Sequence, residues 1–392
     1  MPICVISTVG ASVFTQASED IKSEWRKFDE QKEIDLQNIA RGQHEFPGKE
    51  MYQRVRNHLE AIRNSPNAEA GLMRASAELK SLIYILKDRQ PNSNDILYFF
   101  ATDTPAGTLA ARIISDFAKD YFSIQTEVVR VEGLQVTDDS SFNTRGIRNL
   151  ISRVFDRLDK APAGTYRRVL NPTGGYKGVV PYLTLIGMVE NDIETSYIYE
   201  NSSALITLRR VPMVLDYGAL GSAHDALLAA EREFITEETL AELLDVQPSD
   251  LPSHPALPLF DVDDDKYSIN GLGVIVLKKL GGKADYEVYL SEQAKKVYDK
   301  LGASDKKTKY EVYLKGAAQQ AWFETHIHPF KNSAGATALK MGHTDERVWA
   351  FREGDRVLIA ELTKHTPSGD YEIVPRKRED YDFAHLWKDQ DA

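Results

Sequence analysis

Short apolar runs alternate with helix-like stretches through the first half of the chain. The runs at 3–7 and 96–101 are continuous, as in strands buried on both faces, while 123–131 alternates apolar and polar residues. We predict strands at 3–7, 96–101, 123–131 and 168–170, with further candidates at 197–199 and 204–208. Helical periods predict helices at 109–121, 144–158 and 179–189, the last so apolar that we expect it to be buried. This alternation favours an α/β fold in which helices cover both faces of a parallel sheet.

Three loops rich in Gly, Ser and Thr follow predicted strands, at 8–12, 102–108 and 171–177. In a parallel sheet the carboxyl ends of the strands meet at one edge, and ligands bind outside that edge. We therefore expect the three loops to form a ligand site.

The loop Asn171-Pro172-Thr173-Gly174-Gly175-Tyr176-Lys177 has the composition of a phosphate-binding turn. Its two glycines let the backbone approach an anion, Lys177 adds a positive charge, and Asn171 and Thr173 can donate to phosphate or ribose. The turn has neither the Walker A spacing nor GxGxxG, which argues against an ordinary NTPase or dehydrogenase. A phosphate-rich nucleotide is the ligand that we predict, with a plain tight connection between strand and helix as the alternative.

The character of the sequence changes near Gly218. Helical periods at 224–232 and 236–244 precede an acidic run at 261–265, a glycine-marked turn at 267–273 and a helix at 274–280. We interpret this segment as a small winged helix-turn-helix module. A role as a spacer or dimer clamp is favoured over DNA recognition because the segment is acidic.

Beyond a predicted hinge at Gly281-Gly282, the elements indicate a compact α+β domain. A strand at 285–290 precedes helices at 292–301 and 309–323 and strands at 347–351, 356–362 and 371–374. The predicted domains are therefore 1–220, 221–283 and 284–392.

Composition narrows the function classes. The formal charge of −11 excludes a uniformly basic coat for nucleic acid, though a local basic site stays possible. Cys4 is the one cysteine, so neither an intrachain disulfide nor a cysteine zinc cage can form, and we expect it to be a buried core residue. His326 and His328 have no evident third ligand, so we expect no metal and no cofactor. With no leader or long apolar stretch, we expect a cytoplasmic protein without a membrane partner.

Ser7-Thr8-Val9-Gly10-Ala11-Ser12, taken with the 171–177 turn, resembles the CARF domain, the CRISPR-associated Rossmann fold. The resemblance implies a homodimer that senses cyclic oligoadenylate, with cyclic tetra-adenylate as the allosteric ligand; a two-fold dimer suits an even-membered ring. The implied ligand-binding residues are Thr8, Gly10, Ser12, Thr102, Thr104, Asn171, Thr173, Gly174, Gly175 and Lys177. Some CARF domains cleave their ligand slowly, and the matching residues here are Ser12 and Lys177. Sensing alone and sensing with cleavage both stay open.

The segments 339–342, 347–352 and 354–358 resemble the central hairpin of RelE-type mRNA interferases. The implied catalytic residues are Arg356, Arg376, Lys377, Arg378, Tyr381, Arg352 and Lys340. The lysine pair of that family is replaced by Val348 and Ala350, for which Arg347, Arg352 or Lys340 could compensate. The resemblance implies a metal-independent endoribonuclease that cuts mRNA in the A site of the 70S ribosome and docks on the ribosomal stalk proteins.

Together these resemblances predict a type III CRISPR ancillary effector, a ribonuclease activated by cyclic oligoadenylate that arrests translation. One alternative is a ring nuclease that degrades cyclic oligoadenylate, with a non-catalytic C-terminal domain; the missing RelE lysines keep it open. The other is a ligand-gated transcription regulator, which the acidic middle segment weakens.

Overall fold

The computed structural model describes the chain apart from residues 32–33, 44, 88, 136–141, 191, 200–203, 210–219, 221–222, 281–285, 303–309, 319–322, 324–326, 329–333, 341–345, 355, 365–376 and 388–392, and apart from the side chains of residues 143, 144 and 328. The chain forms two compact units. The first consists of Met1–Met213, Leu227–Ala241 and Leu257–Lys278, and the second of Val214–Ala226, Glu242–Ala256 and Lys279–Ala392. Segments of the predicted middle module fall into both units, so the boundaries at 220 and 283 stay predictions.

A six-stranded sheet of order β3-β2-β1-β4-β5-β6 forms the centre of the first unit. Its strands are β1 Ile3–Val9, β2 Ile96–Ala101, β3 Gln125–Arg130, β4 Arg167–Asn171, β5 Ile193–Ile198 and β6 Leu205–Leu208. The first five are parallel and β6 is antiparallel, which confirms the mixed α/β fold with a parallel sheet. The chain moves outward from β1 to β3 and then returns to start β4 beside β1, so the strand order reverses between β1 and β4. Such a reversal is the usual place for a ligand crevice.

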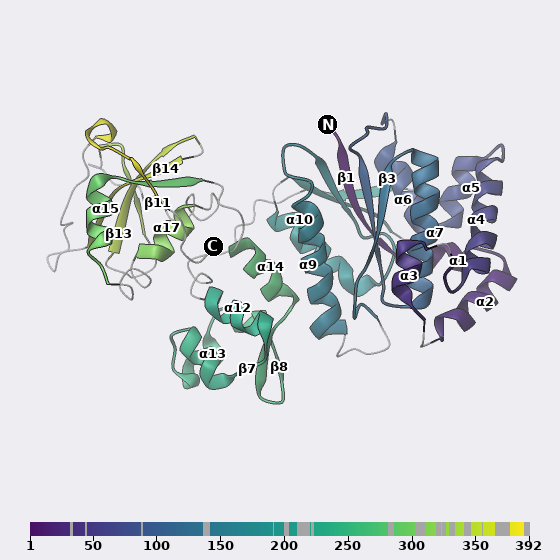
Figure 1. Cartoon of the computed structure of the whole chain (residues 1–392), viewed down its shortest axis with the longest axis horizontal. Coiled ribbons are helices and arrows are strands. Elements are labelled where there is room, and N and C mark those ends of the chain that lie inside the picture. The colour runs from purple at the N-terminus through teal and green to yellow at the C-terminus, as the bar shows by residue number, and fades with distance from the viewer. Residues whose placement is uncertain are drawn as a thin grey trace. The chain divides into compact units, whose positions relative to one another are not determined.

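Helices lie on both sides of this sheet, with α9 and α10 on one side and α6 and α7 on the other (Figure 1). The helices of this region are α1 Ser12–Thr15, α2 Glu19–Asp29, α3 Leu36–Arg41, α4 Lys49–Arg63, α5 Ala68–Ala75, α6 Ala77–Leu86, α7 Pro105–Phe122, α9 Ile147–Leu158 and α10 Val180–Val189. A π-helical turn at Phe142–Gly146 precedes α9, and a 3-10 turn at Lys177–Val179 precedes α10. The polar stretch between β1 and β2 is thus a series of helices.

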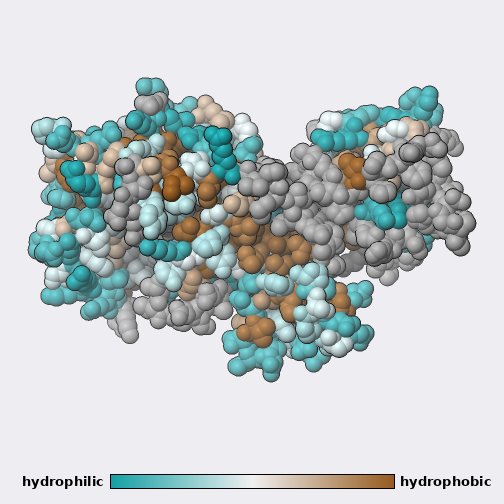
Figure 2. All heavy atoms as spheres, turned by 180° about the vertical axis from the view of Figure 1, so that it is seen from behind, coloured by the Kyte–Doolittle hydropathy of each residue, from teal (hydrophilic) through white to brown (hydrophobic). Residues whose placement is uncertain are grey.

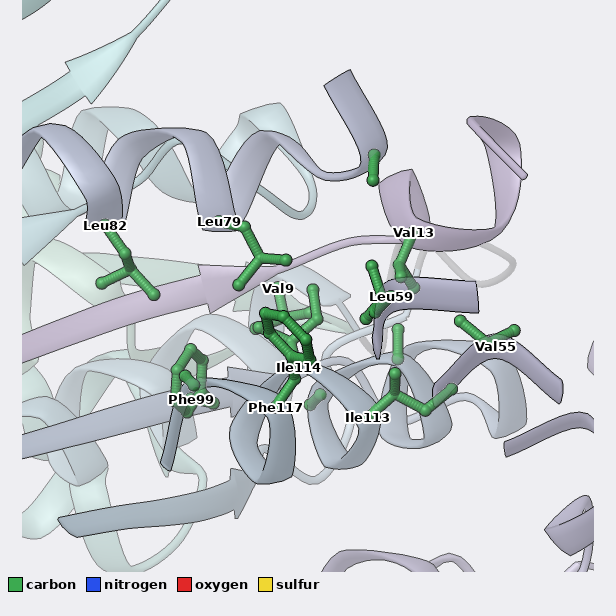
Figure 3. Packing of buried hydrophobic residues seen from close by; sticks show 14 of the residues in the cluster. Val9, Val13, Val55, Leu59, Leu79, Leu82, Phe99, Ile113, Ile114 and Phe117 are labelled. Atoms are coloured by element: carbon green, nitrogen blue, oxygen red, sulfur yellow. The ribbon is translucent and has the colours of Figure 1, made fainter. Parts of the chain in front are cut away.

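One continuous apolar cluster joins β1 and β2 to α6 and α7. Figure 3 shows Leu79 and Leu82 of α6 above Val9 and Phe99 of the strands and Ile114 of α7. The α7 helix begins four residues earlier than its apolar period predicts, because the Thr104 side chain accepts the Gly107 N–H and Pro105 occupies the first turn. The start of α7 therefore lies directly at the end of β2.

The α10 helix is only partly buried, which corrects the expectation that so apolar a helix lies wholly inside. Leu183, Ile186 and Val189 are buried, while Leu185 and Met188 are half-buried. A helix that covers one face of a sheet can bury only one of its own sides. Among the helices of the described residues, none is long and apolar enough to span a membrane.

The segment after β6 contains short helices and a hairpin. Its elements are α12 His224–Arg232, β7 Ile235–Thr236, α13 Glu237–Leu243, β8 Phe260–Asp263, β9 Lys266–Ile269 and α14 Gly271–Leu280, with 3-10 turns at Pro248–Ser253 and Leu257–Leu259. The hairpin turns at Asp264 and Asp265, both with positive φ, so the turn precedes the glycines. Gly273 lies within α14, where a Cβ would come 2.4 Å from the carbonyl oxygen of Leu259. The glycine therefore permits close packing rather than a turn.

The second unit contains a six-stranded sheet of order β11-β12-β13-β14-β10-β15. Its elements are β10 Glu287–Leu290, α15 Glu292–Asp299, α17 Val312–Ala317, β11 Ile327–His328, β12 Thr337–Leu339, β13 Glu346–Glu353, β14 Arg356–Lys364, a 3-10 turn at Arg378–Asp380 and β15 His385–Leu386. Among the strands that the structure describes in this sheet, only the β10–β14 pair is parallel. The predicted strand at 371–374 and the hinge at 281–282 lie outside the described residues.

Side chains of this second sheet alternate between two apolar clusters. Val348 and Ala350 pack with α15 and α17 on the helix-covered face. Trp349 and Phe351 point the other way and pack with Tyr381; we name this side the Trp349 face.

Hydrophilic residues cover much of the coloured surface in Figure 2, with hydrophobic patches between them.

Phe117, fully buried on α7, provides a test of the first core. Replacing it with alanine leaves a cavity and should cost about 3–5 kcal/mol. Amide hydrogen exchange in β1 peptides, followed by mass spectrometry, should accelerate by about two to four orders of magnitude. Phe234→Ala, which truncates a phenylalanine that is 52% exposed, is the matched control and should leave β1 exchange unchanged.

Candidate functional site

The loops after β1 and β4 meet in backbone contact. A Cβ on Gly10 would lie 2.6 Å from the Gly175 nitrogen, closer than real Cβ atoms come to any neighbour. Gly175 has a φ of +85°, in the left-handed region that favours glycine. Because β1 and β4 are neighbours at the point where the strand order reverses, the two loops predicted from sequence share one place.

Several polar groups that were expected to face a ligand instead join the loops to each other. The Thr8 hydroxyl donates to the Gly174 carbonyl at 2.5 Å. The Asn171 amide donates to the hydroxyls of Ser7 at 2.9 Å and Ser81 at 2.8 Å. Asn171 is fully buried. Its two amide hydrogens are thus bound to protein partners, which makes Asn171 an anchor of the turn.

Thr173 has the same kind of role. Its hydroxyl donates to the Asn171 side-chain oxygen at 2.6 Å and accepts the Ile198 N–H at 3.1 Å. A hydroxyl has a single hydrogen to donate, so Thr173 in this arrangement has none for a phosphate. The turn is therefore rigid, and its exposed part begins after Gly175.

A buried glutamate that the sequence analysis did not single out underlies both loops. The Glu78 carboxylate, on α6, accepts the Gly10 N–H at 2.9 Å and the Ser76 hydroxyl at 2.7 Å, and it accepts the Ser12 hydroxyl as well. Glu78 is fully buried, and a Cβ on Gly174 would lie 2.0 Å from its Oε1. A glutamate in the first turn of an amphipathic helix is usually solvated, so no local pattern marks it.

The third predicted loop bonds partly to itself and, through Asp103, to Gly133 at 2.8 Å and Arg130 at 3.2 Å. Thr104 caps α7, and its hydroxyl lies 3.2 Å from that of Thr102. A Cβ on Gly107 would come 1.7 Å from the Thr102 hydroxyl, so this hydroxyl is packed against the helix start. The side-chain contacts of Thr102 and Thr104 therefore explain how α7 begins, and they do not join these residues to the other two loops.

An aromatic pair and a lysine lie where the turn becomes exposed. The Tyr176 ring is 39% exposed and meets the Phe142 ring edge-on, with centroids 4.7 Å apart. Lys177, also exposed, begins the 3-10 turn that leads into α10. Backbone N–H groups at such a helix start and a lysine attract phosphate, and an exposed tyrosine can stack on a base. The site thus has the groups that a nucleotide needs.

The predicted catalytic arginines Arg356 and Arg378 lie on the Trp349 face of the second unit. Arg356 is opposite Glu287 on β10 and Glu353 on β13, and its guanidinium is 5.4 Å from the Tyr289 ring centre. Arg378 is bonded to Glu353 at 2.6 Å. That hydrogen bond, with the charges of Arg378 and Arg356, lowers the pKa of Glu353 against a desolvation effect that raises it. Glu353 therefore links the two arginines.

The other predicted catalytic residues are distributed differently. Tyr381 is buried and donates to Glu361 at 3.1 Å. Arg352 lies over Tyr286 on the helix-covered face, so it is separated from Arg356 by the sheet. Lys340 is half-buried after β12 and Lys377 is exposed before a 3-10 turn. Arg376 lies outside the described residues.

The residues at the positions of the family's lysine pair, Val348 and Ala350, and the neighbouring Arg347 are buried in the second unit. Val348 and Ala350 are fully buried in the core. Arg347 is buried and donates to the Glu346 carbonyl at 2.6 Å. Of the residues that could compensate for the missing lysines, Arg347 is thus buried, whereas Arg352 is exposed and lies over the Tyr286 ring.

Cys4, His326 and His328 are the other residues that the sequence analysis considered for chemistry. Burial raises the pKa of Cys4 to about 12, so its thiol stays protonated at neutral pH, as expected for a core residue. His326 and the side chain of His328 lie outside the described part of the chain. Within that part, no three His, Cys, Asp or Glu side chains are grouped to hold a metal ion.

Residues 73–211 match a family model described as CRISPR-associated protein (Cas_APE2256). The matched segment is about a third of the chain; it includes Glu78 and the 171–177 turn and ends after β6. It leaves out β1 with its loop and the whole second sheet. The match supports a CRISPR-associated protein.

Gly174→Ala tests the packing of the turn on Glu78. Because the new methyl would overlap the carboxylate, we expect a loss of about 1–3 kcal/mol. Differential scanning calorimetry should show a melting temperature lower by several degrees. Gly302→Ala, where no described atom lies within 4 Å of the new Cβ, is the control, and an equal drop in both variants would contradict the packing argument.

Proposed function

We propose that this chain is a type III CRISPR ancillary effector whose first unit binds cyclic oligoadenylate and whose second unit then cleaves mRNA on the ribosome. The contact between Gly10 and Gly175 is the observation that carries the ligand site. It brings the two CARF-like loops together at the reversal between β1 and β4. The family match supports the same context, because it covers the turn that contains Lys177.

The ligand we propose is cyclic tetra-adenylate. Lys177 and the start of α10 supply positive potential for phosphate, and Tyr176 offers a ring face for adenine. Ring and protein would share two-fold symmetry in a homodimer, each subunit presenting one half of the pocket. The half-buried apolar residues Leu185 and Met188 of α10 suit such a subunit contact, since this helix begins at the ligand turn.

The proposed output is metal-independent cleavage of mRNA in the ribosomal A site, in the cytoplasm. The arrangement on the Trp349 face favours this chemistry over a carboxylate-bound metal, because its two arginines can bind the scissile phosphate and stabilise charge on the phosphorane. In the free protein both arginines are bound to glutamates. RNA phosphate would take the place of Glu287 and Glu353. The 70S ribosome, its stalk proteins and mRNA are the proposed partners.

A ring nuclease is the second candidate. It is favoured by the position of Ser12, one of the two residues matched to cleaving CARF domains, beside a buried carboxylate in the same loop pair. Regulation of transcription stays a third possibility, weakened by the acidic hairpin at 261–265.

Lys177→Ala should weaken binding of cyclic tetra-adenylate about ten- to a hundredfold, because a charged hydrogen bond to phosphate is lost. Isothermal titration calorimetry at two salt concentrations measures this, and the salt dependence of the affinity should also become shallower. Lys119→Ala is the control. Lys119 is exposed near the end of α7, whose start lies at the ligand edge, so this change should leave the affinity intact.

Arg356→Ala and Arg378→Ala should each lower mRNA cleavage by about a hundredfold or more in a translating extract that contains cyclic tetra-adenylate. Mapping of mRNA 5′ ends would report the cuts. Lys296→Ala, on α15 over the other face of the sheet, should cut like the wild type. Loss of the ligand without any mRNA cut would instead favour the ring nuclease, and ligand-dependent binding to DNA would favour the regulator.

A further inference from the structure

We propose that the rings of Tyr289 and Phe383 are stacking platforms for RNA bases, which hold the nucleotides on either side of the phosphate that Arg356 and Arg378 bind. The inference rests on the proposed function, because it assigns a base-binding role to residues beside the proposed cleavage site of the second unit. Neither ring is among the residues that the resemblance to RelE-type interferases implies.

Tyr289 and Phe383 lie at the border of the apolar cluster on the Trp349 face. The members of the cluster are buried, whereas these two side chains are half-buried and pack against it. Tyr289 belongs to β10, and Phe383 precedes β15. Each ring is therefore supported by the core and still has a part that a ligand can reach.

Each ring also lies under one of the two arginines of the proposed RNA site. The Arg356 guanidinium is 5.4 Å from the Tyr289 ring centre, and that of Arg378 is 4.7 Å from the Phe383 ring centre. A cation over an aromatic ring at such an exposed position contributes little stability. A phosphate that draws an arginine from its ring therefore opposes only a weak contact, and the ring face becomes accessible beside the bound phosphate.

The chemistry of an uncovered ring face selects the base among the parts of a nucleotide. Phosphate and ribose are hydrophilic, whereas every base has a flat π face that stacks on an aromatic side chain. The sugar joins each base to its phosphate, so a base whose phosphate is bound by an arginine is close to the ring under that arginine. Because stacking discriminates poorly among bases, the two rings would fix the position of the cleaved phosphate more than the choice of codon.

Tyr381, a neighbouring aromatic residue, is unsuited to the same role. It is buried, and its ring centre is 5.9 Å from that of Phe383. Its hydroxyl donates to the buried Glu361 at 3.1 Å. Tyr381 thus supports the ring of Phe383 from the core, and the more exposed Phe383 is the ring that a base can meet.

Substitutions that keep or remove a ring separate stacking from plain hydrophobic packing. Tyr289→Leu and Phe383→Leu keep an apolar side chain but lose the ring face, so each should lower kcat/KM for mRNA cleavage about tenfold. Tyr289→Phe and Phe383→Tyr keep the ring and should rescue most of that loss. Phe234→Leu, which removes a ring that is 52% exposed in the first unit, is the matched control and should cleave like the wild type.

The experiment uses the full chain, cyclic tetra-adenylate and ribosomes programmed with a defined mRNA. An abasic nucleotide is placed at each position of the A-site codon in turn, which removes one base and keeps its sugar and phosphate. In the wild type, the abasic nucleotide at a stacked position should lower kcat/KM about tenfold. In the matching leucine variant the same nucleotide should cause no further loss, because ring and base belong to one interaction.

Three results would overturn the proposal. Leucine variants that cleave like the wild type would do so, and so would an equal abasic loss in wild type and variants, which means that the rings only hold the arginines. Both leave the proposed function intact. A wild-type protein that cuts no mRNA with the ligand present would refute the proposed function, and this inference with it.

Thermal unfolding shows whether each leucine variant folds. If one does not, the wild type decides alone. Cleavage that an abasic nucleotide lowers at some codon position would support the stacking role, and cleavage that is unaffected at every position would overturn it.

Discussion

The ligand edge of the first unit depends on the backbone contact between Gly10 and Gly175. The contact requires a residue without Cβ at Gly10 and a left-handed backbone at Gly175. It also joins two loops that are far apart in the sequence, the one after β1 and the one after β4. Beneath the contact, Glu78 binds the Gly10 N–H and lies against Gly174. One buried carboxylate thus fixes both loops, and the geometry of any ligand pocket at this edge depends on it.

That constraint also divides the polar residues of the edge into two groups. Thr8, Asn171 and Thr173 donate their hydrogens to protein acceptors in and beneath the loops, which makes the turn rigid. Tyr176 and Lys177 are exposed beyond it. A rigid turn that presents a lysine and a ring at its end holds its ligand groups in position before the ligand arrives, which lowers the entropy cost of binding.

Much of this arrangement could be predicted from the sequence. The continuous apolar runs at β1 and β2 and the alternation of strand and helix are enough to predict the parallel sheet, and the glycine loops follow from the ends of those strands. Glu78 could not be found in this way. Its carboxylate can be buried because Gly10 and Ser12, more than sixty residues away in the sequence, donate hydrogen bonds to it. In the second unit, Arg352 and Arg356 are close in sequence but lie on opposite faces, since the hairpin turn falls between them. Alternate side chains of β13 point to the same face of the sheet, so Arg352 is predicted to share the face of the core residues Val348 and Ala350.

The account has one central claim, that the loops after β1 and β4 form a pocket for cyclic oligoadenylate. Hydrogen–deuterium exchange of the full chain with and without cyclic tetra-adenylate tests it most directly. Ligand should slow exchange in peptides that cover 8–12 and 171–179 and leave the β2–α7 loop at 102–104 largely unchanged. Unchanged exchange in both loops at a saturating ligand concentration, or protection confined to other segments, would contradict the claim.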